Sequence, residues 1–190
     1  MVPDRKKEVI NVCLDHFIEK GLSETSTRSL SRALQLQNAG LYYYFESKDE
    51  AVIQCAEEAA LRLENALIPF AIKDIDKPDD MMKRLQDKAD ELAPTMSFFV
   101  SVCASKRYKE SMKPVLDRLA ERYDMYTRKI AALLNCKKDE IEAYVYMTIA
   151  AAVNYMIFAE DAIVKPQLKI VKCEIKKLYN RQNCKEMHMM

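Results

Sequence analysis

Apolar residues recur at helical spacing near the start of the chain. They fall three or four positions apart, which places them on one face of an α-helix. The pattern predicts a first helix over residues 8–20, ended by Gly21 in the left-handed conformation of a C-terminal cap. The apolar face of this helix comprises Ile10, Cys13, Leu14 and Phe17.

Two short helices are predicted next, separated by a break at residues 35–37. Thr25, Ser26 and Thr27 are N-cap candidates for the first of them, because their hydroxyls can accept from free amides of the first turn. The second is very short, over about 38–44. Together they form a small predicted core with residues of the first helix: Leu14, Phe17, Leu30, Ala33, Leu34, Leu36, Leu41 and Phe45.

A fourth helix is predicted from Ser47 to about Leu67. Ser47 and Glu50 match a capping box, in which the serine closes the helix start and the glutamate reaches back to it. Pro69 is the expected terminator. Longer amphipathic helices follow, and all but the one at 138–160 have a proline at or near the start, where a missing amide costs little. They are predicted at 78–92, 94–106, 112–134, 138–160 and 166–181, so the fold class is all-α with about nine helices.

Composition narrows the functional classes. The chain has 190 residues and only two glycines, too few for a dinucleotide-binding fingerprint or a phosphate-binding loop. Six cysteines are scattered without zinc-ligand spacing, so no metal and no cofactor is expected. The two histidines, His16 and His188, have no catalytic partner at useful spacing, and the acidic doublets point apart on helices. We therefore expect no enzyme.

Charge and hydropathy bear on location. The net charge is +1, so any case for nucleic-acid binding depends on local placement of charge. The amino terminus lacks the apolar stretch of a signal peptide, which makes a cytoplasmic location the expectation. Residues 143–159 carry no charge over seventeen positions. This segment is slightly short for a bilayer span, and burial against other helices is the preferred interpretation over insertion into a membrane.

Residues 25–45 suggest a helix-turn-helix, a motif whose second helix enters the major groove of DNA. The groups left exposed on the second helix are small side chains, amides and tyrosine hydroxyls, which suit close approach, base edges and phosphates. Arg28, Arg32 and Lys48 flank this helix, and residues 5–7 form a basic arm. Positive charge is thus placed beside the candidate reading helix.

Residues 8–55 resemble the N-terminal domain of the TetR family of bacterial transcriptional regulators. The resemblance rests on the first helix ending in Phe17 with Glu19-Lys20-Gly21, then Thr25-Ser26, Arg28 and Leu30, then Leu41-Tyr42-Tyr43-Tyr44-Phe45 and Ser47-Lys48-Asp49-Glu50. It implies a helix-turn-helix DNA-binding domain over residues 1–48, extending into the fourth helix to about 62. It also implies a helical effector-binding and dimerisation domain over residues 49–190.

The chain departs from the family pattern at the turn. Gln35 stands where the family usually has glycine, so it must adopt a left-handed conformation at a cost of about 1 kcal/mol, or the turn is reshaped. Gln37 stands where a serine cap is usual, which leaves Asn38 to cap one residue later. Ala39-Gly40 reverses the commoner order of glycine and a small residue.

The resemblance implies which residues contact DNA. Thr27, Arg28, Tyr42 and Lys48 would contact phosphates, Gly40 would permit close approach, and base edges would be faced by Gln37, Asn38, Ala39 and Tyr43. Other interpretations stay open. Tyr42 and Tyr44 could cover the small core, Lys48 could be a solvated lysine at a helix start, and the helix pair could belong to an adaptor or structural dimer that never touches DNA.

For the C-terminal part the resemblance implies a homodimer and a small-molecule effector. The predicted helices at 138–160 and 166–181 are the natural dimer pair, although they could instead complete an intramolecular core. Aromatic and sulfur-containing side chains suit an apolar or aromatic effector, whose binding would release a repressor from its double-stranded operator. The candidate pocket residues, each of which could equally pack as core, are Met96, Phe99, Cys103, Tyr123, Tyr126, Met147 and Tyr155.

Overall fold

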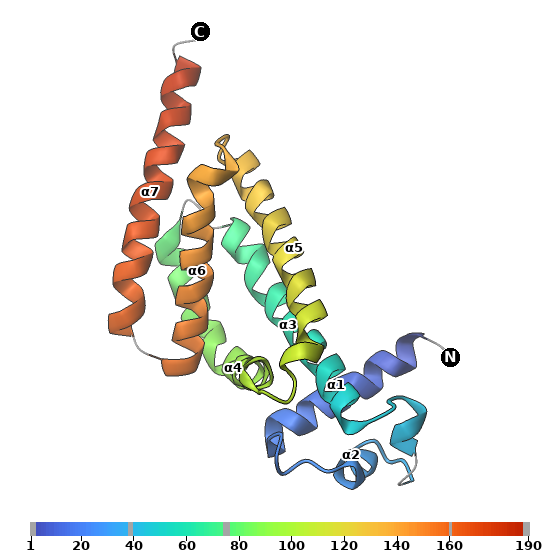
Figure 1. Ribbon diagram of the computed structural model, residues 1–190. Helices are drawn as coiled ribbons and strands as arrows, with labels where there is room; N and C mark the ends of the chain where they lie inside the picture. Colours follow the sequence, from blue (N-terminus) through green and yellow to red (C-terminus); the bar gives the residue numbers. More distant parts are fainter. Residues whose placement is uncertain (1–2, 38–39, 74–76, 160, 188–190) are drawn as a thin grey trace. The chain divides into compact units, whose positions relative to one another are not determined.

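The computed structural model describes residues 3–37, 40–73, 77–159 and 161–187, and within these ranges it is entirely helical (Figure 1). The prediction of an all-α fold is confirmed. The described elements are α1 (Pro3–Lys20), α2 (Thr27–Ala33), the 3-10 helix η1 (Gly40–Tyr43), α3 (Lys48–Lys73), α4 (Pro78–Ala104), α5 (Lys109–Leu133), α6 (Lys138–Phe158) and α7 (Asp161–Met187).

The described residues form eight helices instead of about nine, because prolines that were expected to begin helices lie inside them. Pro94 stands within α4, so the helices predicted at 78–92 and 94–106 are one. A proline inside a helix removes one backbone hydrogen bond and usually kinks or breaks the helix, but here the apolar face of α4 continues on both sides of Pro94. Leu92 and Met96, four residues apart across Pro94, are both buried. Pro114 and Pro166 likewise lie inside α5 and α7.

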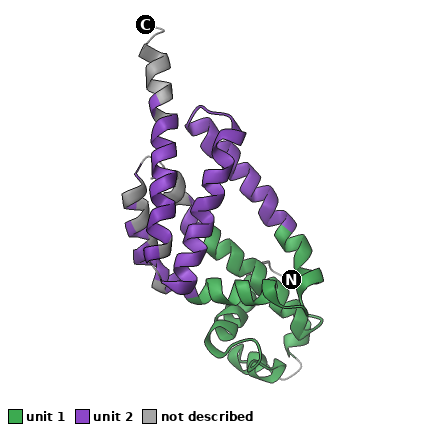
Figure 2. Cartoon of the chain, turned by 60° about the vertical axis from the view of Figure 1, so that its left-hand side comes forward, with its two compact units in different colours: residues 1–64, 94–116 green, residues 65–93, 117–190 purple. Residues whose placement is uncertain are grey.

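The chain divides into two compact units (Figure 2). Unit 1 comprises residues 1–64 and 94–116, and unit 2 comprises residues 65–93 and 117–190. Unit 1 therefore adds the end of α4 and the start of α5 to the N-terminal helices. The functional boundary after residue 48 stays a prediction.

Unit 1 has a core in which α1, α2, η1, α3 and α4 all take part. Leu14, Leu30 and Leu41 are fully buried, and Phe17 stacks on Phe98 with ring centroids 5.8 Å apart. Burying a side chain of this size stabilises the fold by about 1.5–3 kcal/mol. Ala33, expected in this core, is exposed instead, and Leu34 and Leu36 are only partly buried, because α2 ends at Ala33 and the chain turns away there.

Unit 2 is built on α6 packed along α7. The main cluster joins both helices to the end of α5, and a smaller one lies nearer the α6–α7 connection. The turn between α5 and α6 is tied by Lys138, whose ammonium contacts the carboxylates of Asp124 at 2.5 Å and Glu142 at 3.1 Å. The main cluster comprises Ile130, Ala131, Leu134, Ile141, Val171, Ile175 and Leu178.

Helix α6 is apolar nearly all round, yet much of it is exposed in the single chain. Tyr146 is 65% exposed and Phe158 63%, and Ile149 and Ile157 are also exposed. By length and composition α6 could cross a membrane, but only 22% of its most apolar window is buried. The expected burial inside the chain is thus only partial. An exposed apolar surface of this kind usually marks an interaction site.

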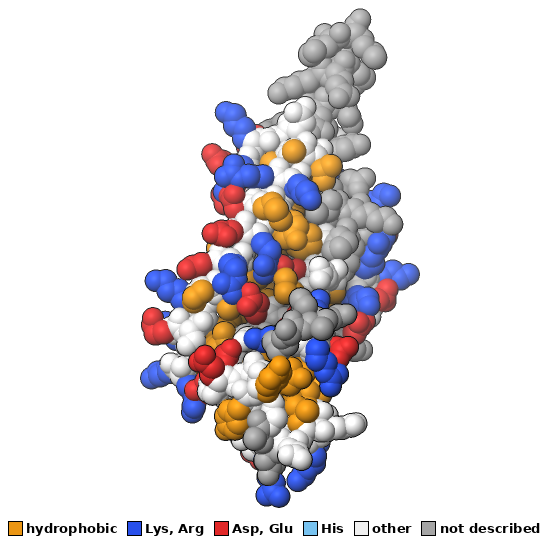
Figure 3. All heavy atoms as spheres, turned by 90° about the vertical axis from the view of Figure 1, so that its right-hand side faces the viewer, with side chains coloured by type: hydrophobic (Ala, Val, Ile, Leu, Met, Phe, Trp, Pro, Cys, Tyr) orange, Lys and Arg blue, Asp and Glu red, His pale blue; other side chains and the backbone are white. Residues whose placement is uncertain are grey.

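Charged side chains are mixed on the surface. On the face shown in Figure 3, Lys and Arg side chains lie among Asp and Glu side chains, in keeping with the net charge of +1. Several form ion pairs between helices, such as Arg62 of α3 with Asp15 of α1 at 2.7 Å. Exposed pairs of this kind contribute little to stability individually.

Two thiols lie in the core of unit 1. Cys13 and Cys55 are fully buried, and the Cys55 thiol lies 3.6 Å from the carbonyl oxygen of Ile10. Burial raises the pKa of Cys13 from 9.0 to about 12 and raises that of Cys55 well above its usual range. Both cysteines therefore act as small apolar residues in the neutral form.

This burial predicts a loss of stability at alkaline pH. Below pH 9 the Cys13 thiol is protonated in both states and has no effect on the pH dependence. Between pH 9 and about 12 only the unfolded chain releases the proton, so the free energy of unfolding falls as pH rises. The loss from Cys13 is about 1.4 kcal/mol at pH 10. Urea unfolding followed by circular dichroism at pH 8, 9 and 10 should show a steeper decline in the natural protein than in Cys13→Ala. Parallel declines would contradict the prediction.

Candidate nucleic-acid interface

The start of α2 is fixed by two serines. The amide of Ser29 donates to the Ser26 hydroxyl and the amide of Ser26 donates to the Ser29 hydroxyl, each at 3.0 Å. This reciprocal pair satisfies two backbone donors that the helix itself leaves free. Ser26 is thus the N-cap among the three candidates. The first turn that it anchors holds Thr27, half-buried, and Arg28, exposed.

The turn after α2 keeps the standard geometry despite its glutamine. Gln35 has a φ of +55°, which is left-handed. The amide of Leu36 donates to the carbonyl of Ser31 at 2.8 Å, and the amide of Gln35 donates to that of Arg32 at 3.0 Å. These two bonds form a Schellman motif, which usually carries glycine at the position of Gln35. Of the two alternatives from the sequence, the structure shows Gln35 in the left-handed conformation and not a reshaped turn.

Gly40 makes the next close approach. A Cβ atom at this position would lie 2.7 Å from the Cβ of Leu36, closer than side chains can come. The amide of Gly40 donates to the carbonyl of Gln37 at 2.7 Å. Glycine is thus required here because the start of η1 folds against the turn. Gly40 contacts Leu36, and its predicted role toward DNA stays a prediction.

The predicted reading helix at 38–44 is described only as the 3-10 helix Gly40–Tyr43. In the described residues it ends at Tyr43, one residue earlier than predicted, and Phe45 already turns into the core. Leu41 and Phe45 anchor it from below, since both are buried. Asn38 and Ala39, the predicted base contacts at its start, lie outside the described residues.

Two tyrosines project from η1. Tyr42 is 57% exposed and Tyr43 is 72% exposed. Tyr42 therefore does not cover the small core, which was the alternative interpretation. Tyr44 is half-buried and packs edge-on against Tyr43 with ring centroids 5.1 Å apart. With the exposed Gln37 just before it, η1 presents one amide and two phenol hydroxyls to solvent.

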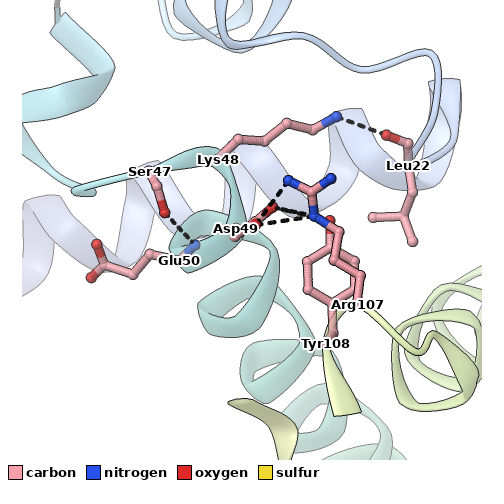
Figure 4. Close-up of polar contacts among 7 residues, drawn as sticks. All are labelled: Leu22, Ser47, Lys48, Asp49, Glu50, Arg107 and Tyr108. Carbon is pink, nitrogen blue, oxygen red and sulfur yellow. Dashed lines mark hydrogen bonds and ion pairs between the residues drawn. The ribbon is translucent and has the colours of Figure 1, made fainter. Parts of the chain in front are cut away.

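Lys48 lies at the start of α3 and is half-buried (Figure 4). Its ammonium donates to the backbone carbonyl of Leu22, in the loop between α1 and α2, at 2.9 Å. The lysine thus ties two segments of unit 1 together. A lysine ammonium has three donors, so this bond alone does not exhaust it.

Ser47 caps α3 as predicted, but Glu50 does not complete the box. The amide of Glu50 donates to the Ser47 hydroxyl at 3.1 Å. The Glu50 carboxylate accepts from the amide of Glu46, one residue before the cap, and not from Ser47. It also accepts from the side-chain amide of Gln54 at 2.6 Å. The helix start is therefore closed by a variant of the expected motif.

The basic arm is partly engaged within the domain. Arg5 donates to Glu8 at 2.7 Å. Hydrogen bonds to Glu8 and then to Tyr44 raise the pKa of Arg5 above its usual value. The ammonium of Lys6 lies 5.9 Å from the centre of the Phe45 ring. The arm thus packs beside η1 and places positive charge next to the proposed reading helix.

A second basic group, which sequence reasoning missed, contacts the start of α3. Arg107, in the α4–α5 turn, donates from Nε to both carboxylate oxygens of Asp49 at 3.0 and 3.1 Å and from a terminal nitrogen at 2.9 Å. The hydroxyl of Tyr108 donates to Asp49 at 3.3 Å. No local pattern signals this contact, because 58 residues separate Arg107 from Asp49.

The predicted effector-pocket residues are divided between the units. Tyr123 has a structural bond, since its hydroxyl donates to the backbone carbonyl of Glu142 at 2.9 Å, and burial raises its pKa. Met147 and Tyr155 pack against the clusters of unit 2. None of the seven lines the open hollow between α1 and α2 beside Gln35. Unit 1 contains Met96, Phe99 and Cys103, and unit 2 contains Tyr123, Tyr126, Met147 and Tyr155.

Within the described part of the chain, no three His, Cys, Asp or Glu side chains gather as a metal site would require.

Residues 10–55 match the family model for bacterial regulatory proteins of the tetR family. The matched stretch runs from α1 through the turn and η1 into α3. The resemblance inferred from the sequence motifs is confirmed for this domain. No curated protein sequence is significantly similar to the chain.

Two solved structures align with most of the chain. The multidrug binding protein EbrR complexed with imidazole is 14% identical, with a TM-score of 0.54, covering 90% of this chain and 95% of that one. The TetR family transcriptional regulator PfmR from Thermus thermophilus is 17% identical, with a TM-score of 0.48, covering 90% and 97%. The likeness to EbrR extends over both units and supports the all-helical architecture.

The turn generates a stability prediction. Replacing Gln35 with glycine should remove the left-handed strain and raise the free energy of unfolding by about 1 kcal/mol. The melting temperature should rise by roughly 2–4 °C. Asn135→Gly is the matched control, since Asn135 also has a left-handed φ, of 44°, but asparagine tolerates it better. Thermal unfolding that shows no larger gain for Gln35→Gly than for Asn135→Gly would count against this account.

Proposed function

Because the N-terminal domain of this chain belongs to the TetR family of bacterial regulatory proteins, we propose that the protein is a DNA-binding transcriptional regulator. It acts in the cytoplasm as a homodimeric repressor that a small-molecule effector releases from its operator. The observation that carries the proposal is the exposure of Tyr42 and Tyr43 on η1, directly after the turn that follows α2.

Phosphate contacts position the domain on the duplex. Arg28 and Tyr42 are exposed on neighbouring elements and offer a guanidinium and a hydroxyl. Thr27 adds a hydroxyl at the start of α2. Lys48 can direct a donor to a phosphate while keeping its bond to Leu22, because its ammonium has more than one N–H. Such contacts supply affinity without regard to sequence.

Base contacts supply specificity. We assign them to Gln37, Asn38, Ala39 and Tyr43, with Gly40 allowing the backbone to come close to the groove. Amides pair with the edge of adenine, and a small side chain can contact the methyl group of thymine. The exposure of Gln37 and Tyr43 supports this assignment.

Dimerisation follows from α6. Its exposed residues Tyr146, Ile149, Ile157 and Phe158 need a cover, and a second copy would supply both that cover and a second reading domain. We therefore assign the dimer interface to the helices at 138–160 and 166–181. Two reading domains about one helical turn of DNA apart would make the operator a two-fold repeat.

The effector is proposed to be apolar or aromatic. Each unit by itself holds half-buried side chains of the kind that line adaptable apolar pockets: Tyr126 and Tyr155 in unit 2, and Phe99 and Cys103 in unit 1. The fold shared with a multidrug binding protein is compatible with this proposal. A compound that binds the protein but leaves its affinity for the operator unchanged would contradict release by that compound.

Selection from random duplex DNA tests the proposal and returns the operator. On that operator, Lys48→Ala should weaken binding about equally for all sequences and reduce the salt slope by about 0.9 for each subunit bound, or about 1.8 for the dimer. Asn38→Ala should instead change which base is preferred, by about 1–3 kcal/mol at one position. Lys129→Ala is the control, because Lys129 is exposed on α5, outside both the helix-turn-helix and the proposed dimer helices, and this variant should bind as the natural protein does.

Two results would go against the contact assignment or the function. Unchanged gel shifts for both Lys48→Ala and Asn38→Ala would refute the assignment. No salt-dependent affinity of the natural protein for any duplex would favour a helical adaptor instead.

The dimer is tested by sedimentation at micromolar concentration. The natural protein should sediment as a dimer, and Ile149→Glu should shift it toward monomer, because a charge would be buried at the interface without a partner. Leu133→Glu is the control: Leu133 is 58% exposed at the end of α5, and its replacement should leave the dimer intact. A monomeric natural protein would rule the dimer out.

A further inference from the structure

The start of α3 places opposite charges side by side. Lys48, a proposed phosphate contact, is followed directly by Asp49, whose side chain is 42% exposed. Glu46 and Glu50 lie within two residues of Lys48. Acidic residues in the first turn stabilise a helix, because the amino end of the helix dipole is positive. The same carboxylates repel DNA phosphates that approach the lysine.

The guanidinium of Arg107 pairs with the carboxylate of Asp49, the residue next to Lys48 (Figure 4). Three hydrogen bonds of 2.9 to 3.1 Å join its guanidinium to Asp49. The buried Tyr108 adds a fourth bond to Asp49 and lies with its ring centre 5.9 Å from the Arg107 guanidinium. Both partners belong to unit 1, so the pair is internal to one compact body.

We propose that Arg107 is a positioning residue for DNA binding, which neutralises Asp49 and so keeps the phosphate-binding start of α3 free of net repulsion. The inference rests on the proposed function and extends it to a residue outside the helix-turn-helix. Asp49 keeps its stabilising place in the first turn of α3, and Arg107 removes its electrostatic cost to DNA.

A direct contact of Arg107 with phosphate is the competing role. The geometry favours neutralisation, because Nε and one terminal nitrogen are both engaged on Asp49. An arginine fork already matched to one carboxylate has its paired donors occupied. The two roles differ when Asp49 is replaced by asparagine. Removing Arg107 should then have no further effect if it only neutralises Asp49, but should weaken binding if it contacts a phosphate.

The test uses full-length Arg107→Ala, Asp49→Asn and the double variant, with binding to the selected operator and to an unrelated duplex measured over a range of salt. Arg107→Ala should weaken binding to both duplexes about fivefold at low salt, since it leaves Asp49 uncompensated. Asp49→Asn should bind at least as tightly as the natural protein. The double variant should match Asp49→Asn in affinity and the natural protein in salt slope.

Arg128→Ala is the matched control. Arg128 is 67% exposed against 69% for Arg107 and pairs with Asp124 at 2.6 Å in the same manner, but in unit 2. Its loss should leave DNA affinity unchanged. Circular dichroism checks that each variant is folded, and Arg107→Lys, which keeps the charge, should bind within about twofold of the natural protein.

Three results would overturn the proposal if Arg107→Ala folds. Natural affinity in Arg107→Ala would show that no compensation is needed. Equal weakening by Arg107→Ala and Asp49→Asn would show a purely structural pair. A double variant as weak as Arg107→Ala, with a salt slope lower by about 0.9 for each subunit bound, would show a direct phosphate contact. If Arg107→Ala does not fold, failure of Arg107→Lys to bind while Asp49→Asn binds normally would equally refute it. Absence of salt-dependent binding by the natural protein would instead count against the proposed function.

Discussion

The arrangement of the N-terminal domain depends on how the chain leaves α2. A left-handed residue at position 35 ends the helix, and the absence of a side chain at Gly40 lets η1 close against Leu36. These two conditions set the direction of η1, with Leu41 and Phe45 buried and Tyr42 and Tyr43 exposed. The strain at Gln35, about 1 kcal/mol, is small beside the burial of the aromatic and leucine side chains that η1 and α1 bring together. A turn with little conformational strain can therefore set which side chains of η1 are exposed.

Much of this could be predicted from sequence because it is local. The helix class, an N-cap among residues 25–27 and the buried Leu41 and Phe45 follow from spacing and from backbone chemistry within a few residues, and the left-handed Gln35 was one of the two alternatives that the sequence left open. Proline positions were less informative. Pro94 marks a helix start in isolation, but burial on both sides of it overrides the loss of one hydrogen bond. The capping box predicted at Ser47 is confirmed only in part. Ser47 caps the helix, but the Glu50 carboxylate accepts from the amide of Glu46 instead of that of Ser47.

The parts that could not be predicted depend on distant pairing. Nothing in the residues around Asp49 indicates that Arg107 will meet it, and nothing around Lys48 indicates a bond to Leu22. The pocket residues illustrate the same limit. Aromatic and thioether side chains in helices pack as core or line a cavity according to what faces them, and spacing along one helix does not specify that partner. Tyr123, for example, directs its hydroxyl to a carbonyl of α6.

A protein that binds DNA must hold positive charge where it meets phosphates, yet its helices are stabilised by negative charge at their starts. In this chain, with a net charge of only +1, the conflict cannot be relieved by a large excess of lysine and arginine. It has to be resolved residue by residue, and the start of α3 is where both demands fall on adjacent positions. In the arrangement that we propose, Lys48 meets the first demand and Asp49 meets the second, and Arg107 neutralises Asp49 without removing the helix-stabilising carboxylate. In that proposal the α4–α5 turn contributes to DNA binding, although none of its residues belongs to the helix-turn-helix.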